Sequence, residues 1–262
     1  MKPSQQAANR ALYNTPDALA HYAAYNVLQP PEMAILKLLG PRLRDMDMLD
    51  IGVGAGRTAL HFPPLARSYL GIDMAAAMVA RCRARFPDLA FALGDAADLA
   101  AVADASADFV LFSFNGIDCL DLDGRRRALL ELRRVLRPGG VLAFSGHNMN
   151  FVPGSALAGS AAARDPLALF DSFKRYLRFR RHVRAVRYDP GFETATVVES
   201  HFGRSVELAY VRPAWQVRQL AELGFAAIRV LPGDSEAVFD ADAAEVGTIA
   251  DPWAYYLCEM PR

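Results

Sequence analysis

The feature of this sequence that most constrains its fold is a glycine-rich loop directly after a short apolar run. Residues 48–58 read MLDIGVGAGRT, so Asp50 ends the run and Gly52, Gly54 and Gly56 occupy alternate positions. The apolar run predicts a buried strand. Glycine adopts backbone conformations with positive φ and lets a ligand touch the main chain. We therefore expect a strand followed by a ligand-binding loop, where the free N–H groups of an opening helix favour a carboxylate or phosphate.

Apolar stretches then alternate with helical patterns up to about residue 150. We expect strands at 47–51, 69–72, 89–93, 109–114 and 141–145, and helices at 58–66, 75–86 and 125–136. Pro63 and Pro64 should stop or kink the first of these helices. The run FVLFSF at 109–114 is apolar enough to be buried on both faces. The alternation predicts an α/β fold with a parallel sheet, right-handed crossovers and helices on both sides.

The regular alternation ends near residue 150. The remaining expectations are a loop-like stretch at 151–166, a basic helix at 166–188, two strands within 191–211 that meet near Gly203, a helix at 213–223, and strands at 225–231 and 253–259. The first 45 residues look helical. We expect a single domain over 1–262, in which 1–45 form an N-terminal helical cap and 150–211 form an inserted substrate lid.

Acidic residues follow the second and third expected strands. Asp73 comes 21 residues after Gly52, and Asp95 follows the third strand. The carboxyl ends of parallel strands meet at one edge, where open α/β sheets bind ligands. Asp73 could accept both hydroxyls of a ribose, and Asp95 could accept the exocyclic amine of adenine beside the Ala96 N–H. Each acid alone is equally well explained by a turn or a helix N-cap, but the two acids together with the glycine loop after the first strand favour a nucleoside site.

A nicotinamide dinucleotide is the rival ligand for such a loop. Its fingerprint is G-x-G-x-x-G after a strand. Here the glycines are spaced G-x-G-x-G and position 57 is Arg. This spacing counts against a nicotinamide oxidoreductase.

The chain resembles the class I S-adenosylmethionine-dependent methyltransferases. The resemblance is carried by LDIGVGAGR at 49–57, LGID at 70–73, GDAADL at 94–99, DFVLFSFNGID at 108–118 and LRRVLRPGGVLAFS at 132–145. It implies a Rossmann-like, mostly parallel sheet of seven strands in the order 3-2-1-4-5-7-6, with strand seven antiparallel. It also implies S-adenosyl-L-methionine as the cofactor and S-adenosyl-L-homocysteine as the product.

The resemblance further implies roles for single residues around the cofactor. Asp73 would hold the ribose, Asp95 would bond the adenine amine, and one N-terminal tyrosine, with Tyr22 as our candidate beside Tyr13 and Tyr25, would close over the cofactor. The remaining implied positions are Asp50, Gly52, Gly54 and Gly56 around the methionine part, Met74 and Ala96 beside adenine, and Ser113 and Phe114 toward the sulfonium and substrate. Arg57 either reaches the cofactor carboxylate or forms a surface salt bridge.

Methyl transfer from a sulfonium needs an aligned, desolvated nucleophile, and it needs a base only if that nucleophile keeps its proton. His147, which follows the fifth strand, is a candidate base, and Asn148 could contact the substrate; both could instead cap the strand end. His201 lies in the turn ESHFG and is a candidate base or an ordinary hairpin residue. Asn115 and Asp118 could contact the substrate, although Asp118 could equally be an N-cap.

The segment 174–187 holds seven basic residues and no acid. It could be a solvated helix face that packs on the core through an apolar stripe. It could instead hold an anionic group on the acceptor, or bind nucleic acid. The net charge of zero gives no global basic field, which makes nucleic acid a poor partner.

The composition limits the other classes of function. Hydrophobic residues make up 53% of the 262 residues, so a substantial core can form. The three cysteines lack a CxxC spacing, so we expect no disulfide framework and no metal site. No uncharged apolar run approaches the roughly 18 residues of a membrane span, and no signal core is present. We expect a cytoplasmic monomer or homodimer without a membrane partner.

These observations leave three hypotheses open. The first is methyl transfer from S-adenosyl-L-methionine to an oxygen, nitrogen or carbon of a small-molecule acceptor by in-line displacement. The second is an RNA or protein methyltransferase that uses the basic segment 174–187. The third is a non-catalytic module that only binds the cofactor.

Overall fold

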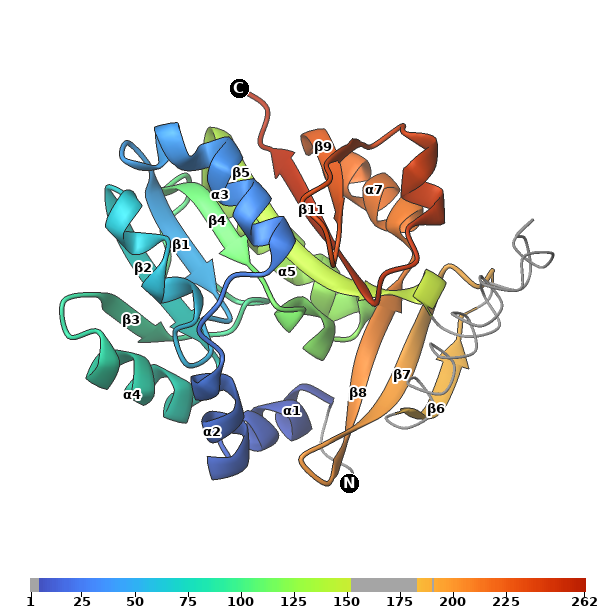
Figure 1. Cartoon of the computed structure of the whole chain (residues 1–262), viewed down its shortest axis with the longest axis horizontal. Coiled ribbons are helices and arrows are strands. Elements are labelled where there is room, and N and C mark those ends of the chain that lie inside the picture. The colour runs from blue at the N-terminus through green and yellow to red at the C-terminus, as the bar shows by residue number, and fades with distance from the viewer. Residues whose placement is uncertain (1–4, 152–182, 190) are drawn as a thin grey trace.

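The protein is described by a computed structural model that covers residues 5–151, 183–189 and 191–262, and it folds around one mixed sheet (Figure 1). The main path of the sheet runs in the order β10-β9-β11-β5-β4-β1-β2-β3. These strands are β1 (Asp47–Ile51), β2 (Ser68–Asp73), β3 (Ala90–Leu93), β4 (Ala107–Phe112), β5 (Leu136–Asn148), β9 (Ala226–Pro232), β10 (Phe239–Asp240) and β11 (Trp253–Glu259).

The strand order confirms the prediction of a 3-2-1-4-5-7-6 sheet. Strands β1 to β5 pair in parallel, whereas β11 is antiparallel to both β5 and β9. β9 and β11 are therefore strands six and seven of that order, and the two-residue strand β10 adds an edge beside β9. The carboxyl ends of β1, β2, β3 and β4 meet at one edge, which is where the glycine loop begins.

Helices cover both faces of the sheet. These are α3 (Pro30–Leu43), α4 (Ala76–Arg85), α5 (Leu122–Val135) and α7 (Pro213–Glu222), whereas α1 (Gln5–Tyr13) and α2 (Pro16–Ala24) lie at the carboxyl-end edge of the sheet (Figure 1). Alternate residues of β4 face opposite layers: Phe109 and Leu111 pack in the cluster that includes α3, whereas Val110 and Phe112 pack in the cluster that includes α5 and α7. This confirms burial of β4 on both faces and explains its continuous apolar run.

A three-stranded extension leaves the sheet at the end of β5 (Figure 1). It consists of β6 (Val183–Tyr188), β7 (Thr194–His201) and β8 (Arg204–Val211). β8 pairs in parallel with β5, placing Tyr210 beside His147, and β7 lies between β8 and β6. The two strands predicted within 191–211 are confirmed. α1 packs against this extension, where Gln5 Nε2 donates a hydrogen bond of 2.7 Å to the Glu207 carbonyl.

Two predicted helices are wrong. Residues 58–66 form two short 3₁₀ helices, Thr58–Leu60 and Pro63–Leu65, because prolines in mid-helix remove N–H donors and clash with the preceding turn. The basic helix predicted over 166–188 ends as a strand: Val183–Tyr188 is β6, paired with β7, and its Val183 and Val186 pack on the hairpin. The rest of that segment lies outside the described residues. None of the described helices has the length and apolarity to cross a bilayer.

Candidate functional site

The three glycines after β1 all have positive φ (64°, 54° and 85°) but serve different purposes. A Cβ on Gly52 would lie 2.8 Å from the Phe112 ring, and one on Gly56 would lie 2.6 Å from the Phe86 ring. A Cβ on Gly54 would meet nothing closer than a backbone oxygen at 4.0 Å. Gly54 and Gly52 line a pocket, here called the glycine-loop pocket, whereas Gly56 does not belong to its lining. At Gly52 and Gly56 a neighbouring ring excludes a side chain. At Gly54 no protein atom does, so only a ligand in the pocket would exclude one there.

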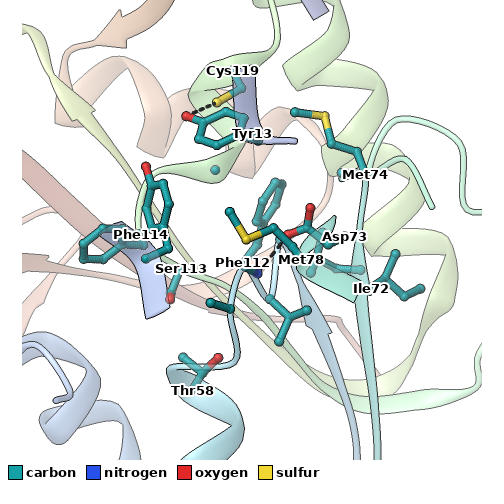
Figure 2. Close-up of a pocket in the computed structure, with 18 of the residues that line it drawn as sticks. Tyr13, Thr58, Ile72, Asp73, Met74, Met78, Phe112, Ser113, Phe114 and Cys119 are labelled. Carbon is teal, nitrogen blue, oxygen red and sulfur yellow. Dashed lines mark hydrogen bonds between the residues drawn. The ribbon is translucent and has the colours of Figure 1, made fainter. Parts of the chain in front are cut away.

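Asp73 lies in the wall of the glycine-loop pocket (Figure 2). Its carboxylate accepts hydrogen bonds of 2.8 Å from the N–H groups of Gly54 and Ala75. Burial raises the pKa of Asp73, although these two N–H groups favour its ionised form. The carboxylate thus joins the loop after β1 to the start of α4 and keeps lone pairs for a hydroxyl donor.

Asp95 lines the same pocket at the end of β3. Its Oδ1 accepts the Ala97 N–H at 3.0 Å, which fixes the turn after the strand. Its Oδ2 contacts two side chains of α1: Gln6 donates a hydrogen bond to it, and Arg10 lies 3.6 Å away. The N-terminal helix therefore reaches over the third strand to the pocket.

The rest of the glycine-loop pocket is largely apolar and aromatic. Met74 and Ala96, predicted beside adenine, both line it together with Ile72 and Met78. Tyr13 and Phe114 lie across the space from Met74 and Asp73 (Figure 2). All three N-terminal tyrosines, Tyr13, Tyr22 and Tyr25, are part of the lining.

Asp50 lies behind the glycine loop, outside the lining of the pocket. It is 1% exposed and accepts hydrogen bonds from Thr58 Oγ1 at 2.5 Å and Tyr69 Oη at 2.8 Å. Burial raises the pKa of Asp50 to about 7, against these hydrogen bonds and the nearby Arg57. These contacts stabilise the loop from the side away from the pocket. Asp50 and Gly56 therefore hold the shape of the loop and do not line the pocket themselves.

Arg57 lines the glycine-loop pocket, but its guanidinium is already paired. It donates to both carboxylate oxygens of Glu32, at 2.5 and 2.6 Å, and to Ser113 Oγ at 3.0 Å. Both ends of this ion pair are buried, and the hydrogen bonds and charge of Arg57 lower the pKa of Glu32 despite desolvation. The sequence predicted that Arg57 either reaches the cofactor carboxylate or forms a surface salt bridge. The structure instead shows a buried ion pair between Arg57 in the loop and Glu32 in α3.

β4 ends at Phe112, two residues earlier than predicted, and is followed by a strained turn. Phe114 and Asn115 have φ values of 58° and 59°, a conformation that costs non-glycine residues of order 1–3 kcal/mol. The Asn115 N–H donates to Ser145 Oγ at 2.8 Å, and Asn115 Oδ1 is buried with no hydrogen-bond partner in the described chain. The turn presents Phe114 to two pockets at once.

A second pocket, here called the aromatic pocket, adjoins the first. The two share Tyr13, Tyr22, Phe114 and Cys119. Six aromatic side chains line the aromatic pocket: Tyr13, Tyr22, Phe114, Phe151, Tyr210 and Trp253. Its polar lining is formed by Gln29, Asn115, His147, Glu199 and His201. The structure thus brings both histidines of the sequence prediction into one pocket with Asn115.

His147 is held from both sides in the aromatic pocket. Its backbone N–H and its Nδ1 both contact Asp118 Oδ2, at 2.5 and 2.7 Å, and its ring stacks on Tyr210 with centroids 4.7 Å apart. Burial lowers the pKa of His147 to about 4, with Glu199 opposing and Arg125 adding to the shift. The imidazole is therefore neutral at pH 7, with its proton on Nδ1 and an acceptor lone pair on Nε2.

Asp118 is fully buried and lies outside the lining of both pockets. It forms an ion pair with Arg125 of α5, which in turn donates to Gln216 of α7 at 2.7 Å. The structure therefore does not support the direct contact between Asp118 and a substrate that the sequence led us to expect. The carboxylate instead orients the His147 ring.

Asn148 is also buried away from both pockets. Its Nδ2 donates to the Ile249 carbonyl at 2.8 Å and its Oδ1 accepts the Asn150 N–H at 2.8 Å. The amide ties the end of β5 to the segment before β11. The structure does not support the predicted contact between Asn148 and a substrate, because this residue is fully buried and lines neither pocket.

Glu199 and Tyr210 are functional candidates that sequence reasoning missed. Tyr210 Oη donates a hydrogen bond to Glu199 Oε1, and His201 Nε2 lies 2.7 Å from Glu199 Oε2. These partners and His147 lower the pKa of Glu199 to about 2, although burial opposes the shift. Both residues sit in a hairpin whose sequence shows only strand patterns, so no local signal marks them. Glu32 and Arg125 were missed for the same reason, since their partners are distant in sequence.

Comparison with known proteins agrees with this geometry. Residues 48–140 match the family model described as "Methyltransferase domain". A protein of Mycolicibacterium smegmatis, described as a probable S-adenosylmethionine-dependent methyltransferase, is 36% identical over 46% of this chain and 46% of its own length. The malonyl-[acyl-carrier protein] O-methyltransferase of Enterobacter lignolyticus is 32% identical over 49% of each chain. The matched region thus spans about half the length of these curated relatives.

Solved structures extend the likeness of the fold to the whole chain. A Thermotoga maritima protein, described as a SAM-dependent methyltransferase and possible histamine N-methyltransferase, superposes with a TM-score of 0.56. The superposition covers 98% of this chain and 99% of that one at 16% identity. The sequence motifs, the sheet order and the matched family together imply S-adenosyl-L-methionine as the cofactor. Residues 48–140 thus match a methyltransferase domain by sequence, and the chain shares the fold of solved S-adenosylmethionine-dependent methyltransferases.

Proposed function

We propose that this protein transfers a methyl group from S-adenosyl-L-methionine to a small molecule held in the aromatic pocket. The observation that carries the proposal is the shared wall of the two pockets, formed by Tyr13, Tyr22, Phe114 and Cys119. One pocket offers the glycine backbone and two carboxylates, and the other offers an imidazole. A donor and an acceptor bound on the two sides of this wall would meet at Phe114.

The residues of the glycine-loop pocket fit the cofactor. Gly54 offers open backbone for the methionine part, Asp73 offers carboxylate lone pairs for the ribose, and Asp95 lies with Ala96 where adenine would bind. When bound, S-adenosyl-L-methionine supplies an electrophilic methyl group on a sulfonium. The aromatic side chains around Phe114 would exclude water from the reacting atoms, and tight orientation supplies much of the rate.

His147 is the residue we propose as the base in this site. Its Nδ1 is turned to Asp118, so Nε2 is the atom that can accept a proton from a hydroxyl, amine or acidic carbon. His201 lies in the same pocket but is paired with Glu199, so we assign it a supporting place. The buried Asn115 Oδ1, which has no hydrogen-bond partner among the described residues, offers an acceptor to the substrate.

A small molecule fits the described residues better than RNA. The part of the basic segment that the structure describes is β6, not an exposed recognition helix. Arg184 donates to Ser205 and Ser200, and Arg187 pairs with Glu207 at 2.7 Å. These cations are engaged within the extension. We therefore propose a small acceptor rather than a phosphate backbone.

Two measurements test the proposal together. Calorimetry with S-adenosyl-L-homocysteine should show binding to the folded protein, and a methyl-labelled cofactor should pass label to a member of a broad panel of small acceptors. Cofactor binding without transfer to any acceptor would favour the non-catalytic hypothesis. Absence of binding in a folded sample would contradict the assignment of the glycine-loop pocket.

A further inference from the structure

The aromatic pocket carries a charge pattern that the methyltransferase assignment leaves open. We propose that the acceptor bears a positively charged group, such as a protonated amine, which binds between the aromatic rings and the Glu199 carboxylate. This inference rests on the proposed function and names the class of its substrate. It follows from the aromatic and charged residues of the pocket.

The first observation is that one carboxylate faces this pocket without a cationic lysine or arginine. Among the described residues, Glu199 is the acid in the lining, and the lining contains no Lys or Arg. The Glu199 side chain is 13% exposed, so its charge is poorly screened by water. An anionic acceptor would be repelled here. The sequence-based expectation of an anionic group depended on residues 174–187, most of which lie outside the described chain.

The second observation is that the neighbouring groups keep Glu199 ionised without filling it. Tyr210 Oη donates to one carboxylate oxygen and His201 Nε2 contacts the other. Each carboxylate oxygen has two lone pairs, so each can still accept a hydrogen bond from a ligand. The third nearby ionisable group, His147, is neutral at pH 7 and adds no positive charge.

The third observation is that aromatic rings line the same pocket as this carboxylate. Tyr210 contacts Glu199 through its hydroxyl group, and Tyr22 and Phe114 belong to the same lining. The face of an aromatic ring attracts a cation within about 6 Å of its centroid, and the attraction grows when the cation is desolvated. A pocket lined by aromatic rings and one ionised carboxylate binds ammonium groups more tightly than neutral head groups. A neutral hydroxyl would gain only a hydrogen bond from the same pocket.

Three ligands with one ring and different head groups test the proposal. We would measure binding of 2-phenylethylamine, 2-phenylethanol and 3-phenylpropanoate to the protein saturated with S-adenosyl-L-homocysteine. The amine should bind at least tenfold more tightly than the alcohol, and the carboxylate should bind most weakly. Equal binding of all three, tighter binding of the carboxylate, or no binding of the amine at millimolar concentration would overturn the proposal.

Glu199→Gln provides the second arm, because it removes the charge and keeps the shape. This variant should reduce the preference for the amine to less than threefold. The matched control is Glu207→Gln, an exposed acid of the neighbouring strand that pairs with Arg187 and does not line the pocket; it should keep the preference. A Glu199→Gln protein with an unchanged preference would contradict the role of this carboxylate.

The same measurements distinguish failure of the proposed function from failure of the charge inference. Binding of S-adenosyl-L-homocysteine is measured first, in the same calorimeter, and its absence would contradict the proposed function. A loaded protein that does not discriminate between the three head groups would overturn only the inference about charge. Because the head-group series uses the unaltered protein, the test does not depend on a variant that folds.

Discussion

The glycine loop offers the sharpest prediction, because Gly54 and Gly56 have similar backbone geometry and different surroundings. Both have positive φ, so an alanine at either position should lose about 1–2 kcal/mol of folding stability from backbone strain alone. Gly56→Ala adds a clash, since its Cβ would lie 2.6 Å from Phe86 and 3.2 Å from Cys82 Sγ. Overpacking of this kind costs about 1–3 kcal/mol more. The total for Gly56→Ala is therefore about 2–5 kcal/mol.

The two variants should affect cofactor binding in the opposite order. The Cβ of Gly54→Ala would point into open space of the glycine-loop pocket, where we place the methionine part of the cofactor. We expect its affinity for S-adenosyl-L-homocysteine to fall at least tenfold, or about 1.4 kcal/mol. Gly56→Ala should bind nearly as well as the original protein once the folded fraction is taken into account.

Urea unfolding and calorimetry on both variants measure these quantities. The reasoning predicts that stability falls more in Gly56→Ala and affinity falls more in Gly54→Ala. Unchanged affinity in Gly54→Ala would refute our explanation of the loop, because it would mean that no ligand approaches this backbone. Loss of affinity in both variants at equal stability would refute the distinction between them.

Three further predictions concern the acids and the imidazole. Asp73→Ala should weaken S-adenosyl-L-homocysteine binding by about 1.5–3 kcal/mol, the worth of a hydrogen bond to a charged group, and unchanged heat of binding would exclude the ribose role. His147→Ala should lower turnover more than cofactor affinity. In the original protein only neutral His147 accepts a proton and its pKa is about 4, so kcat/KM should fall only as the pH drops toward 4. A fall in kcat/KM near pH 6.5 would argue against His147 as the base. Glu32→Gln should cost about 3–5 kcal/mol in urea unfolding at pH 7, because Arg57 is left buried and unpaired; the exposed Glu236→Gln is its control, at under about 1 kcal/mol. Since the pKa of folded Glu32 is lowered, the stability from this pair is present above the unfolded pKa of about 4.3 and is lost as pH falls through the folded value, so a Glu32→Gln penalty that does not shrink in acid would contradict the ion pair.

Much of the fold could be predicted from local patterns. The run at 109–114 is apolar at every position except Ser113, which is why burial of β4 on both faces could be predicted from the sequence. The strand at Trp253–Glu259 was predicted with its observed bounds. The errors came where a distant partner decides the outcome. Val183–Tyr188 forms a strand because it pairs with the edge of β7. No local feature of this basic segment predicts that pairing.

The sequence by itself determined which segments form the parallel strands, where the glycine loop lies and the edge at which Asp73 and Asp95 meet, because strand period and turn residues are local properties. The order of the strands was implied by the resemblance to a known family. Tertiary structure alone decided which of those residues face a ligand. It turned Gly54 toward the pocket and Gly56 toward Phe86, and it paired Arg57 with Glu32. It also brought His147 beside Glu199 and Tyr210. The physical reason is that hydrogen bonds and burial depend on partners far along the chain, and a side chain can serve a substrate only where those partners leave its polar atoms free.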